Sequence, residues 1–407
     1  MPFTIALSGL NAASADLGVT ANNIANVNTN GFKMSRAQFA EVFAVGTQSV
    51  SSSASGSGVR LSSIAQQFTQ GNIDFTDNAL DLAIGGEGFF VLNDNGARLY
   101  SRAGAFGVDN TGFVVNAQGA RLQAYPFAGS GLFNTGTPVD LQLTTGANPP
   151  SATTQADFGI NLPANAAVPV NPVFDPADPS SFNHTTSVTV YDSLGAAQTA
   201  TVYFIKDAAV NTWNTEVQIG GTPVAGAGAG QIVFNPDGSL DTPAGGLIPL
   251  APYDPGTGAD PITMSLDFSS ATQFGDNFGV NSLSQDGFTT GRLTGVSVDA
   301  EGIVFARFTN GQSTSLGKLA LANFVNPQGL QQLGDTAWGE SFQSGSALLG
   351  EAGTASFGSI QSGALEASNV DLTAQLVQMI TAQRNFQANA QMISTADTVT
   401  QTVINIR

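Results

Sequence analysis

Apolar residues recur every seven positions near the N-terminus of the chain. Two interleaved series have this spacing: Phe3, Leu10, Leu17 and Ile24, and, three positions after each, Ala6, Ala13, Thr20 and Val27. Alternating steps of three and four residues place side chains on one face of an α-helix. We therefore predict a long amphipathic helix over residues 1–31. It should end in the Asn-rich run before Gly31, because Asn and Gly tolerate the left-handed conformation that closes helices.

The C-terminal segment repeats this pattern. Its heptad series is Leu372, Met379, Phe386, Ile393 and Thr400, and the apolar stripe is widened by Leu376, Ile380 and Ile404. Ser368 is placed to cap this helix, with Asp371 three positions later. About 37 helical residues at ~1.5 Å each predict a rod of roughly 55 Å within residues 363–407. A single helix of this kind needs a partner to bury its stripe.

Few charged side chains accompany these stripes. Residues 1–32 carry one charge, Asp16, and residues 372–406 carry two, Arg384 and Asp397. An antiparallel coiled coil within one chain would explain the heptads, but coiled coils in water usually flank their seam with Glu and Lys. Ala, Ser, Thr, Asn and Gln suit burial against neighbouring helices instead. We expect helix packing in a polymer at Phe3, Leu10, Leu17, Ile24, Leu372, Leu376, Met379, Ile380, Phe386, Ile393 and Ile404.

The segments between the helices have the alternation and turns of β-structure. Residues 88–125 and 293–325 contain short apolar runs separated by turn sequences such as Asp94-Asn95-Gly96 and Asn310-Gly311. Between them, 14 of the 18 prolines fall from Pro149 to Pro261. Residues 146–284 also carry 12 carboxylates and one basic side chain, Lys206, so we expect a solvated, separate domain there.

The predicted fold class is mainly β with α-helical termini that form a coiled-coil-like inner domain. The expected boundaries are 1–31 for the N-terminal helix, 32–71 for an extended or irregular connector, 72–145 with 285–362 for a discontinuous β domain, 146–284 for an inserted outer β domain and 363–407 for the C-terminal helix.

The composition of the chain excludes most kinds of catalytic site. The chain has 407 residues, no Cys and one His, which excludes thiolate nucleophiles, disulfides and Cys/His metal clusters. With 30 acidic and 12 basic side chains, the net charge of -18 argues against nucleic acid or anionic membranes as partners. No Lys or Arg precedes Lys33, so the charged region of a cleavable secretory signal is missing, and we predict no membrane insertion.

Four polar motifs were weighed as chemical sites, and each has a simpler structural explanation. Asp109–Gly112 resembles the start of a calcium loop but lacks the later bidentate acid, so a hairpin turn is favoured. Gly85–Gly88 precedes a strand, not the helix that phosphate binding requires. The loop carboxylates Asp175, Asp178, Asp254 and Asp260 are typical turn formers, and His184 is expected in a loop. We predict no enzyme, no metal and no cofactor.

Both ends of the chain resemble the flagellar rod, hook and junction proteins of bacteria. The similar segments are ANNIANVNTNGFK (21–33) and SGALEASNVDLTAQLVQMITAQRNFQANAQMISTADTVTQTVINI (362–406). The matching signature residues are Asn22, Asn23, Asn26, Gly31, Phe32, Ser368, Asn369, Val370, Asp371, Gln383 and Arg384. GFFVL (88–92) and LANFVNPQGL (321–330) are similar to the β domain that rod and hook proteins share.

The middle of the chain separates the members of this family. Rod proteins of this family are shorter, whereas VTVYDSLGAAQTATVYF (188–204) resembles the outer domain of the hook subunit. The resemblance implies a helical homopolymer that joins rod to filament as a curved, flexible, torque-transmitting tube around an export channel, needed for motility. It implies export by the flagellar type III apparatus, location outside the cell on the basal body, and distal rod, hook cap and hook–filament junction proteins as partners.

Two other functions stay open on the sequence. A distal rod protein would share both ends, and a deletion strain would then stop before completing its rod. A secreted β-rich adhesin or carbohydrate-active protein fits the acidic, Cys-free composition, although it leaves both heptad stripes unexplained.

Overall fold

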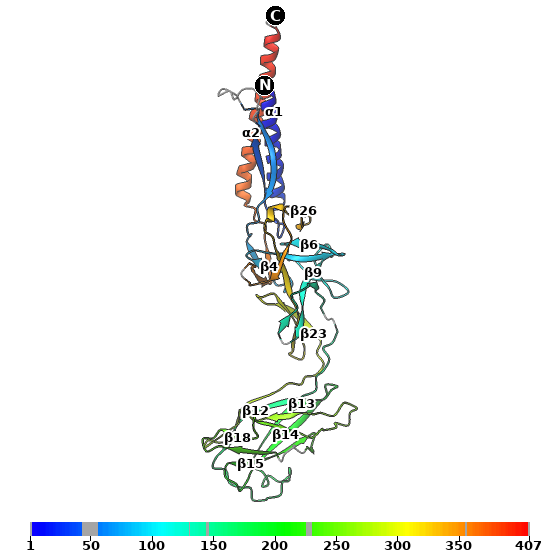
Figure 1. The fold of residues 1–407 in the computed structure, drawn as a ribbon, viewed down its shortest axis with the longest axis vertical. Helices are drawn as coiled ribbons and strands as arrows, with labels where there is room; N and C mark the ends of the chain where they lie inside the picture. Colours follow the sequence, from blue (N-terminus) through cyan, green and yellow to red (C-terminus); the bar gives the residue numbers. More distant parts are fainter. Residues whose placement is uncertain are drawn as a thin grey trace. The chain divides into compact units, whose positions relative to one another are not determined.

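The computed structural model describes residues 2–42, 56–129, 131–143, 146–224, 230–354 and 356–405. The chain divides into two compact units. Unit 1 comprises Met1–Thr145, Gly295–Arg307 and Ser313–Arg407, and unit 2 comprises Gly146–Thr294 and Phe308–Gln312. Figure 1 shows the elements of both units. The numbering of strands below follows that figure.

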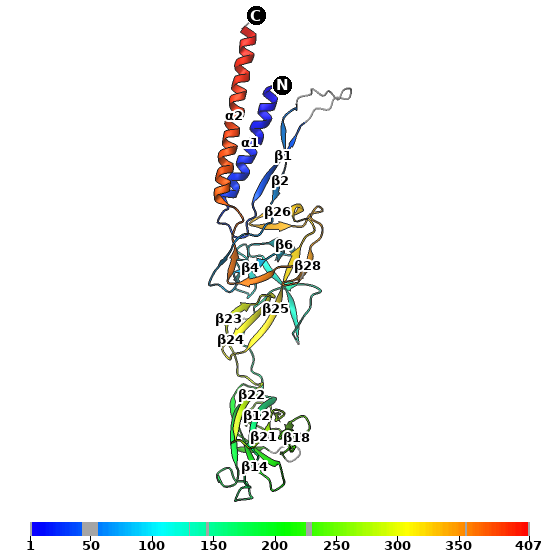
Figure 2. The same cartoon turned by 90° about the vertical axis from the view of Figure 1, so that its left-hand side faces the viewer.

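Two helices and a β-hairpin form one part of unit 1. Helix α1 spans Pro2–Ala25 and helix α2 spans Leu372–Asn405, and the two pack against each other. Strands β1 (Ser35–Glu41) and β2 (Val59–Gln66) pair in an antiparallel hairpin that contacts α1. Figure 2 shows α1 lying between α2 and this hairpin.

The ends of the helices differ from the predicted boundaries. Helix α1 ends at Ala25, and residues 26–30 form turns in which the Asn26 side-chain amide donates to the Asn22 carbonyl. Asn side chains compete with the backbone in this way, which favours turns over helix. At the start of α2 the cap is Asp371, not Ser368, because the Asp371 carboxylate accepts from the amides of Thr373 and Ala374.

The rest of unit 1 consists of β-structure. Its largest sheet follows the order β23-β24-β25-β9-β5-β6-β27-β26, with β7, β8, β10, β11 and β28 attached along it, and two small sheets pair β29 with β4 and β3 with β30. The bounds are β3 Ile73–Phe75, β4 Leu82–Gly85, β5 Phe89–Asp94, β6 Ala97–Ser101, β7 Gly107–Val108, β8 Val114–Val115, β9 Arg121–Gly129, β10 Leu132–Phe133, β11 Val139–Asp140, β23 Leu293–Val298, β24 Ile303–Phe308, β25 Ser313–Asn323, β26 Gln331–Gly334, β27 Ala337–Gly339, β28 Leu348–Glu351, β29 Ser359–Ser362 and β30 Ala364–Glu366, with a short 3-10 helix at Pro327–Gly329.

Strands from both sides of the insert pair directly in this sheet. Leu321 of β25 lies opposite Phe90 of β5, and Lys318 of the same strand lies opposite Tyr125 of β9. Alternate residues of β5 enter two cores, with Phe90 in one cluster and Phe89 in the other. Because both faces of β5 are buried from Phe89 to Leu92, this part of the strand is continuously apolar.

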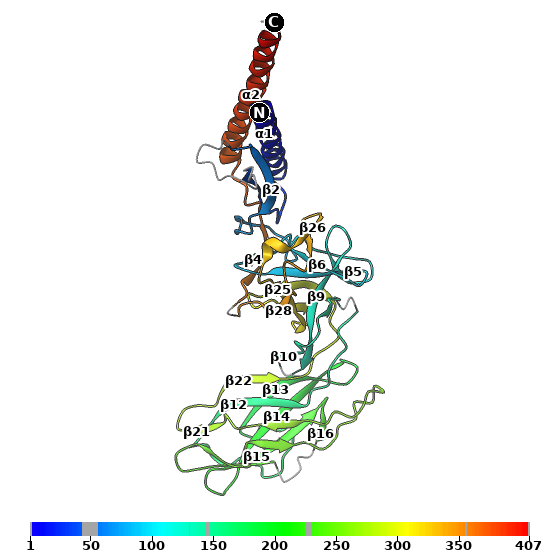
Figure 3. The ribbon, with the colours of Figure 1, turned by 45° about the horizontal axis from the view of Figure 1, so that its top comes forward.

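Unit 2 is built from two packed sheets. One has the order β19-β20-β12-β21 with β22 paired to β12, and the other has β13-β14-β15-β17-β18 with β16 paired to β15. The bounds are β12 Gln155–Pro163, β13 His184–Tyr191, β14 Ala197–Lys206, β15 Thr212–Ile219, β16 Thr222–Val224, β17 Gln231–Phe234, β18 Leu240–Thr242, β19 Leu247–Pro249, β20 Ser265–Asp267, β21 Thr272–Phe274 and β22 Gly279–Gln285. One cluster of buried side chains draws on both sheets, including Phe158 and Phe204. Figure 3 shows β13, β14 and β15 as neighbouring strands.

The predicted fold class, mainly β with terminal helices that pack together, is confirmed. For residues 32–71 we expected an extended or irregular connector, and the described part of that segment contains the paired strands β1 and β2. Residues 43–55 of the segment lie outside the described part of the chain. Residues 364–366, which we placed with the C-terminal helix, form β30. His184 begins β13 instead of lying in a loop, and its ring stacks on Phe278.

Candidate functional site

Small and polar side chains form the seam between α1 and α2. The most deeply buried residues of α1 are Ala6, Ala13, Thr20 and Asn23, and on α2 Ala382 is buried. At Gly9 the helices approach so closely that an added Cβ would lie 2.5 Å from the Asn389 Oδ1 atom. The two helices of one chain therefore meet without burying their larger apolar residues.

Polar pairs along this seam fix the register of the helices. The Asn23 amide donates to the Gln375 Oε1 atom at 3.1 Å, and the Gln378 amide donates to the Asp16 carboxylate at 3.3 Å. Hydrogen bonds between two specific side chains are lost when a helix slides by one residue, whereas apolar contacts tolerate such a shift. These pairs thus specify which residues of α1 and α2 lie side by side.

Asn23 also connects α1 to the hairpin. Its side-chain amide donates to the Ser35 carbonyl at 2.8 Å, and its Oδ1 accepts from the Ser35 amide at 2.9 Å. Near the other end of α1, the Ser8 hydroxyl accepts from the Val59 amide. Asn23 thus holds α2 and β1 against α1 at once, which gives this signature residue a structural role.

The large apolar residues predicted to pack are only partly covered by the described chain. Phe3, Leu372, Leu376, Ile380, Phe386 and Ile404 are exposed. Leu10, Leu17, Ile24, Met379 and Ile393 are half-buried. Leu7, Val377, Met392 and Val399 are exposed as well, although sequence reasoning did not select them. Extended apolar surface of this kind marks a site of protein interaction.

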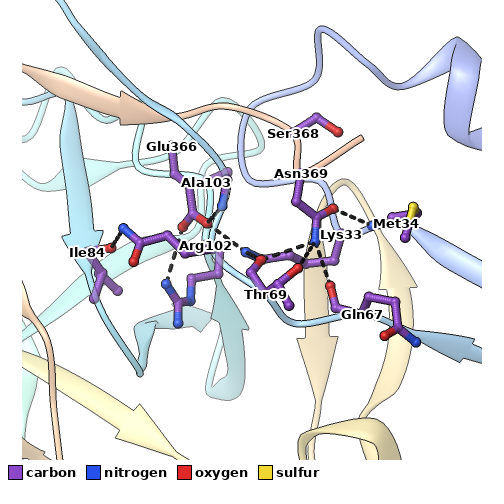
Figure 4. Close-up of polar contacts among 12 residues, drawn as sticks. Lys33, Met34, Gln67, Thr69, Ile84, Arg102, Ala103, Glu366, Ser368 and Asn369 are labelled. Atoms are coloured by element: carbon purple, nitrogen blue, oxygen red, sulfur yellow. Dashed lines mark hydrogen bonds and ion pairs between the residues drawn. The ribbon is translucent and has the colours of Figure 1, made fainter. Parts of the chain in front are cut away.

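A buried ionic cluster holds the base of the helices to the β-structure (Figure 4). The Glu366 carboxylate accepts from Lys33 Nζ at 2.6 Å and from Arg102 Nη1 at 3.2 Å. The side chains of Lys33, Glu366 and Arg102 are 1 %, 0 % and 5 % exposed. The Gly71 amide donates to the same carboxylate at 2.8 Å. One side chain from β30 therefore binds the segment that follows α1, the segment between β2 and β3, and the segment that follows β6.

The electrostatics of this cluster depend on Glu366. Burial lowers the pKa of the Lys33 ammonium and of the Arg102 guanidinium, and the nearby Glu366 carboxylate opposes both shifts. Lys33 Nζ also donates to the Thr69 carbonyl, and Arg102 Nη2 donates to the Gly86 carbonyl. Two buried cations share one buried anion, so removing the anion would leave Lys33 without a counter-charge and Arg102 with only the weaker attraction of Glu87.

The residues between β30 and α2 add further hydrogen bonds (Figure 4). The Asn369 Oδ1 atom accepts from the Met34 amide at 2.7 Å. The Asn369 Nδ2 atom donates to the carbonyls of Gln67 and Thr69. Because Asn369 lies just before the helix cap Asp371, these bonds set where α2 leaves the β-structure.

Gly31 and Phe32 close the base on the α1 side. The Gly31 amide donates to the Glu366 carbonyl at 2.7 Å. Its φ angle is +69°, and an added Cβ would lie 2.4 Å from the Ala103 amide nitrogen. Only glycine fits both requirements. Phe32, the next residue, is buried.

Some of the remaining signature residues lie on the surface, and others lie at the base of the two helices. Asn22, Asp371, Gln383 and Arg384 are exposed, Asn26 and Ser368 are half-buried, and Val370 is buried. The side chains of Gln383 and Arg384 make no hydrogen bond or ion pair within the described ranges, so nothing in the described chain itself accounts for these two side chains.

Sequence reasoning missed Arg102 and Glu366. The two lie in segments that are 264 residues apart, and pairing over such a distance leaves no periodic pattern. A signal was nevertheless present. Lys33 is the first basic residue after a nearly uncharged segment, and Glu366 is an isolated acid before a nearly uncharged helix.

The four motifs weighed as chemical sites have structural roles. Asp109 accepts from the amides of Thr111 and Phe113 in the β7–β8 turn, and Thr111 lowers the pKa of its carboxyl group. Gly86 and Gly88 have positive φ angles between β4 and β5. Asp178 and Asp254 bond within their own loops. Among the described residues, no group of His, Asp and Glu is arranged to hold a metal ion.

Neither of the two described helices is long and apolar enough to span a membrane.

Four family matches together cover most of the chain. Residues 3–33 match the family described as flagella basal body rod protein, and residues 361–406 match flagellar basal body rod FlgEFG protein C-terminal. Residues 83–171 match the flagellar hook protein FlgE/F/G D1 domain, and residues 161–288 match the flagellar basal body protein FlaE D2 domain.

Relatives similar to the whole chain carry one name. Flagellar hook protein FlgE of Escherichia coli is 41 % identical over 100 % of both chains. Flagellar hook protein FlgE of Borreliella burgdorferi is 32 % identical over 98 % of both chains. The crystal structure of Helicobacter pylori flagellar hook protein FlgE2 has a similar fold, with a TM-score of 0.54 at 14 % identity over 72 % of this chain and 100 % of that one.

Proposed function

This chain belongs to the flagellar hook protein FlgE family, and we propose that it is the structural subunit that polymerises helically into the curved, flexible tube of the hook. The hook is the extracellular part of the flagellum attached to the basal body, and the tube would transmit torque from rod to filament around an export channel. A rotating joint of this kind is needed for motility. The role is structural, and we infer that the chain has no catalytic activity.

The exposed apolar surface of α1 and α2 carries this proposal. A soluble monomer gains nothing from Leu376 and Phe386 in water, and each represents apolar area that a neighbouring copy can bury. Since one copy presents this surface to another that presents a different face, the contact is heterologous and propagates into a helix. We therefore infer that the predicted packing residues make the contacts between neighbouring copies.

The partners of the tube follow from where such a polymer begins and ends. We infer contacts with the distal rod at one end, with the hook–filament junction proteins at the other, and with a cap during growth. We also infer export through the flagellar type III apparatus. These partners extend the hook and basal-body context of the family.

The test replaces Leu376 and Phe386 by Asp in one chain. Charges on this surface should abolish tubes in negative-stain images, because each buried carboxylate would lack a partner. Both residues are exposed on α2, so circular dichroism should show β-structure that melts as in the unaltered protein.

A matched control carries the same change in charge elsewhere. Val170→Asp and Leu194→Asp lie on exposed positions of unit 2 and should leave tube formation intact. Tubes formed by the Leu376→Asp/Phe386→Asp protein would contradict the role of the terminal helices.

A further inference from the structure

Methionines are the oxidisable sulfur groups of this chain, because it has no cysteine. The hook lies outside the cell, where oxidants reach it without the thiol reductants of the cytosol. Of the five methionines, Met264 is 4 % exposed in the core of unit 2, whereas Met34 is half-buried and Met392 is 52 % exposed. Among these three, Met34 combines access to solvent with polar contacts to distant parts of the chain.

Met34 connects three elements of unit 1. It lies between α1 and β1, and its amide donates to the Asn369 Oδ1 atom just before α2 (Figure 4). Its Sδ atom accepts from the Gln375 Nε2 atom of α2 at 3.4 Å. The Gln375 Oε1 atom accepts in turn from the Asn23 Nδ2 atom of α1 at 3.1 Å. A single amide side chain therefore links the Met34 sulfur to the seam between the two helices.

A pocket beside the seam gives small molecules a path to Met34. Its lining includes Met34, Asn23 and Gln375, and its volume is about 200 Å³. A water molecule needs roughly 10–15 Å³ of such space. Hydrogen peroxide is scarcely larger than water, so the pocket has room for it.

We propose that Met34 is an oxidation site whose sulfoxide loosens α2 from α1. In this reaction a lone pair of the sulfur attacks one oxygen of hydrogen peroxide. An S–O bond forms as the O–O bond breaks, the proton of the transferred oxygen moves to the departing oxygen, and that oxygen leaves as water. The sulfur is oxidised and the peroxide is reduced. The inference goes beyond the proposed function and can be tested on the monomer.

Both configurations of the sulfoxide weaken the contact with Gln375. An N–H···O hydrogen bond alone takes about 2.9 Å, so an oxygen placed between Sδ and Nε2, which are 3.4 Å apart, must push these atoms away from each other. An oxygen on the other lone pair withdraws electrons from the sulfur, and the thioether is already a weak acceptor. In either case Gln375 loses a partner, and its bond with Asn23 is no longer held in one geometry.

The test uses the full chain carrying Met379→Leu and Met392→Leu, because these two methionines on α2 are also accessible. Leu replaces Met at similar volume and keeps the surface apolar. After treatment with hydrogen peroxide, peptide mass spectrometry should find one added oxygen on Met34 well before the buried Met264 reacts. Hydrogen exchange in the paired ends of α1 and α2 should then be at least about threefold faster than in the same protein before treatment.

Met34→Leu added to the same protein is the matched control. It removes the reactive sulfur at the seam and keeps Met1 and Met264, so peroxide should leave its hydrogen exchange unchanged. In the protein that retains Met34, methionine sulfoxide reductases for both epimers should restore the original exchange rate.

Three results would overturn the inference. Met34 might react no faster than Met264, exchange might stay constant after Met34 is oxidised, or exchange might rise equally in the control. Each of these results concerns the monomer and leaves the hook function standing, whereas absence of tubes from the unaltered chain would contradict that function and leave the oxidation site untouched.

Discussion

Large apolar side chains are buried in unit 2, whereas on the terminal helices of unit 1 several of them are exposed. In unit 2, Phe158, Phe204 and Trp213 are completely buried between two sheets. On α1 and α2, alanine, glycine and amide side chains fill the seam, and Leu376 and Phe386 remain exposed. Unit 2 has its own core, whereas the helices keep their apolar surface for other molecules. The difference can be tested by measuring folding and assembly separately.

The largest effect on folding is expected in the core of unit 2. Trp213→Ala removes a fully buried ring and should cost about 3–5 kcal/mol of unfolding free energy. Denaturant unfolding followed by circular dichroism should show an earlier transition for unit 2 alone. The control Leu194→Ala removes an exposed side chain and should shift the transition by less than about 0.5 kcal/mol. Equal shifts for both changes would contradict a self-contained core.

Removing the buried anion of unit 1 should have an effect of similar size by a different mechanism. Glu366→Gln leaves Lys33 and Arg102 buried beside a neutral amide and should cost about 3–5 kcal/mol. Hydrogen exchange should show faster exchange at the base of both helices.

A surface ion pair provides the matched control for that change. The pair Arg121–Asp140 is partly exposed, and Arg121→Gln should cost at most about 1 kcal/mol. If Glu366→Gln behaved like this control, the buried cluster would not hold the helices to the β-structure.

Asn23 and Leu376 should separate folding from assembly. Asn23→Ala leaves the Ser35 amide without its partner and breaks the link to Gln375, at a cost of about 1–3 kcal/mol in the monomer. Leu376→Ala removes an exposed side chain, so the monomer should change by less than about 0.5 kcal/mol while tube formation weakens. Thermal unfolding and tube yield should be measured on both proteins. Asn23→Ala should lower the unfolding temperature of the monomer, whereas Leu376→Ala should lower the tube yield and leave the unfolding temperature nearly unchanged. A Leu376→Ala monomer as unstable as Asn23→Ala would contradict it.

The sequence predicted the helices and their separation by β-structure, because both depend on local periodicity and turn residues. It did not predict which helix face pairs within the chain. Phe3, Leu10, Leu17 and Ile24 have the same heptad spacing as Ala6, Ala13 and Thr20, and only the approach at Gly9 shows that the small residues form the seam. Periodicity predicts that one face of a helix is buried, but it does not identify the partner that covers that face.

The long-range polar contacts could not be predicted from local sequence patterns, for a related reason. Glu366 meets Lys33 and Arg102 only after the β-structure has folded, and Asn369 bonds to the segments before and after the hairpin. The hairpin itself was missed because Ser, Ala, Arg and Gln alternate in β1 and β2 without a clear apolar face. The strand conformation of these residues accompanies the antiparallel pairing of β1 with β2 and their packing against α1, neither of which is visible in the local pattern.

The smallest expected effect is a pH dependence confined to unit 2. His184 stacks on Phe278 at 4.5 Å, and burial lowers the pKa of its imidazole below the ordinary 6.5. Between the lowered pKa and 6.5 the unfolded chain binds a proton that the folded unit does not, so stability should fall as the pH drops through that window and should be fully present above it.

Hydrogen bonds lower the pKa values of several carboxyl groups in unit 2, such as Asp178 and Asp237. Their contribution to stability begins to fall only below about pH 5, where the unfolded chain starts to bind protons at these groups, so the measurement should stay above that pH. Denaturant midpoints measured from about pH 7 down to about pH 5.5 should decline for the unaltered protein and stay flat for His184→Gln. The helix pair of unit 1 contains no histidine, so its hydrogen exchange, corrected for the intrinsic rate, should not change over the same range. A decline that persisted in His184→Gln would assign the pH dependence to another group and leave the stacked histidine without a role in it.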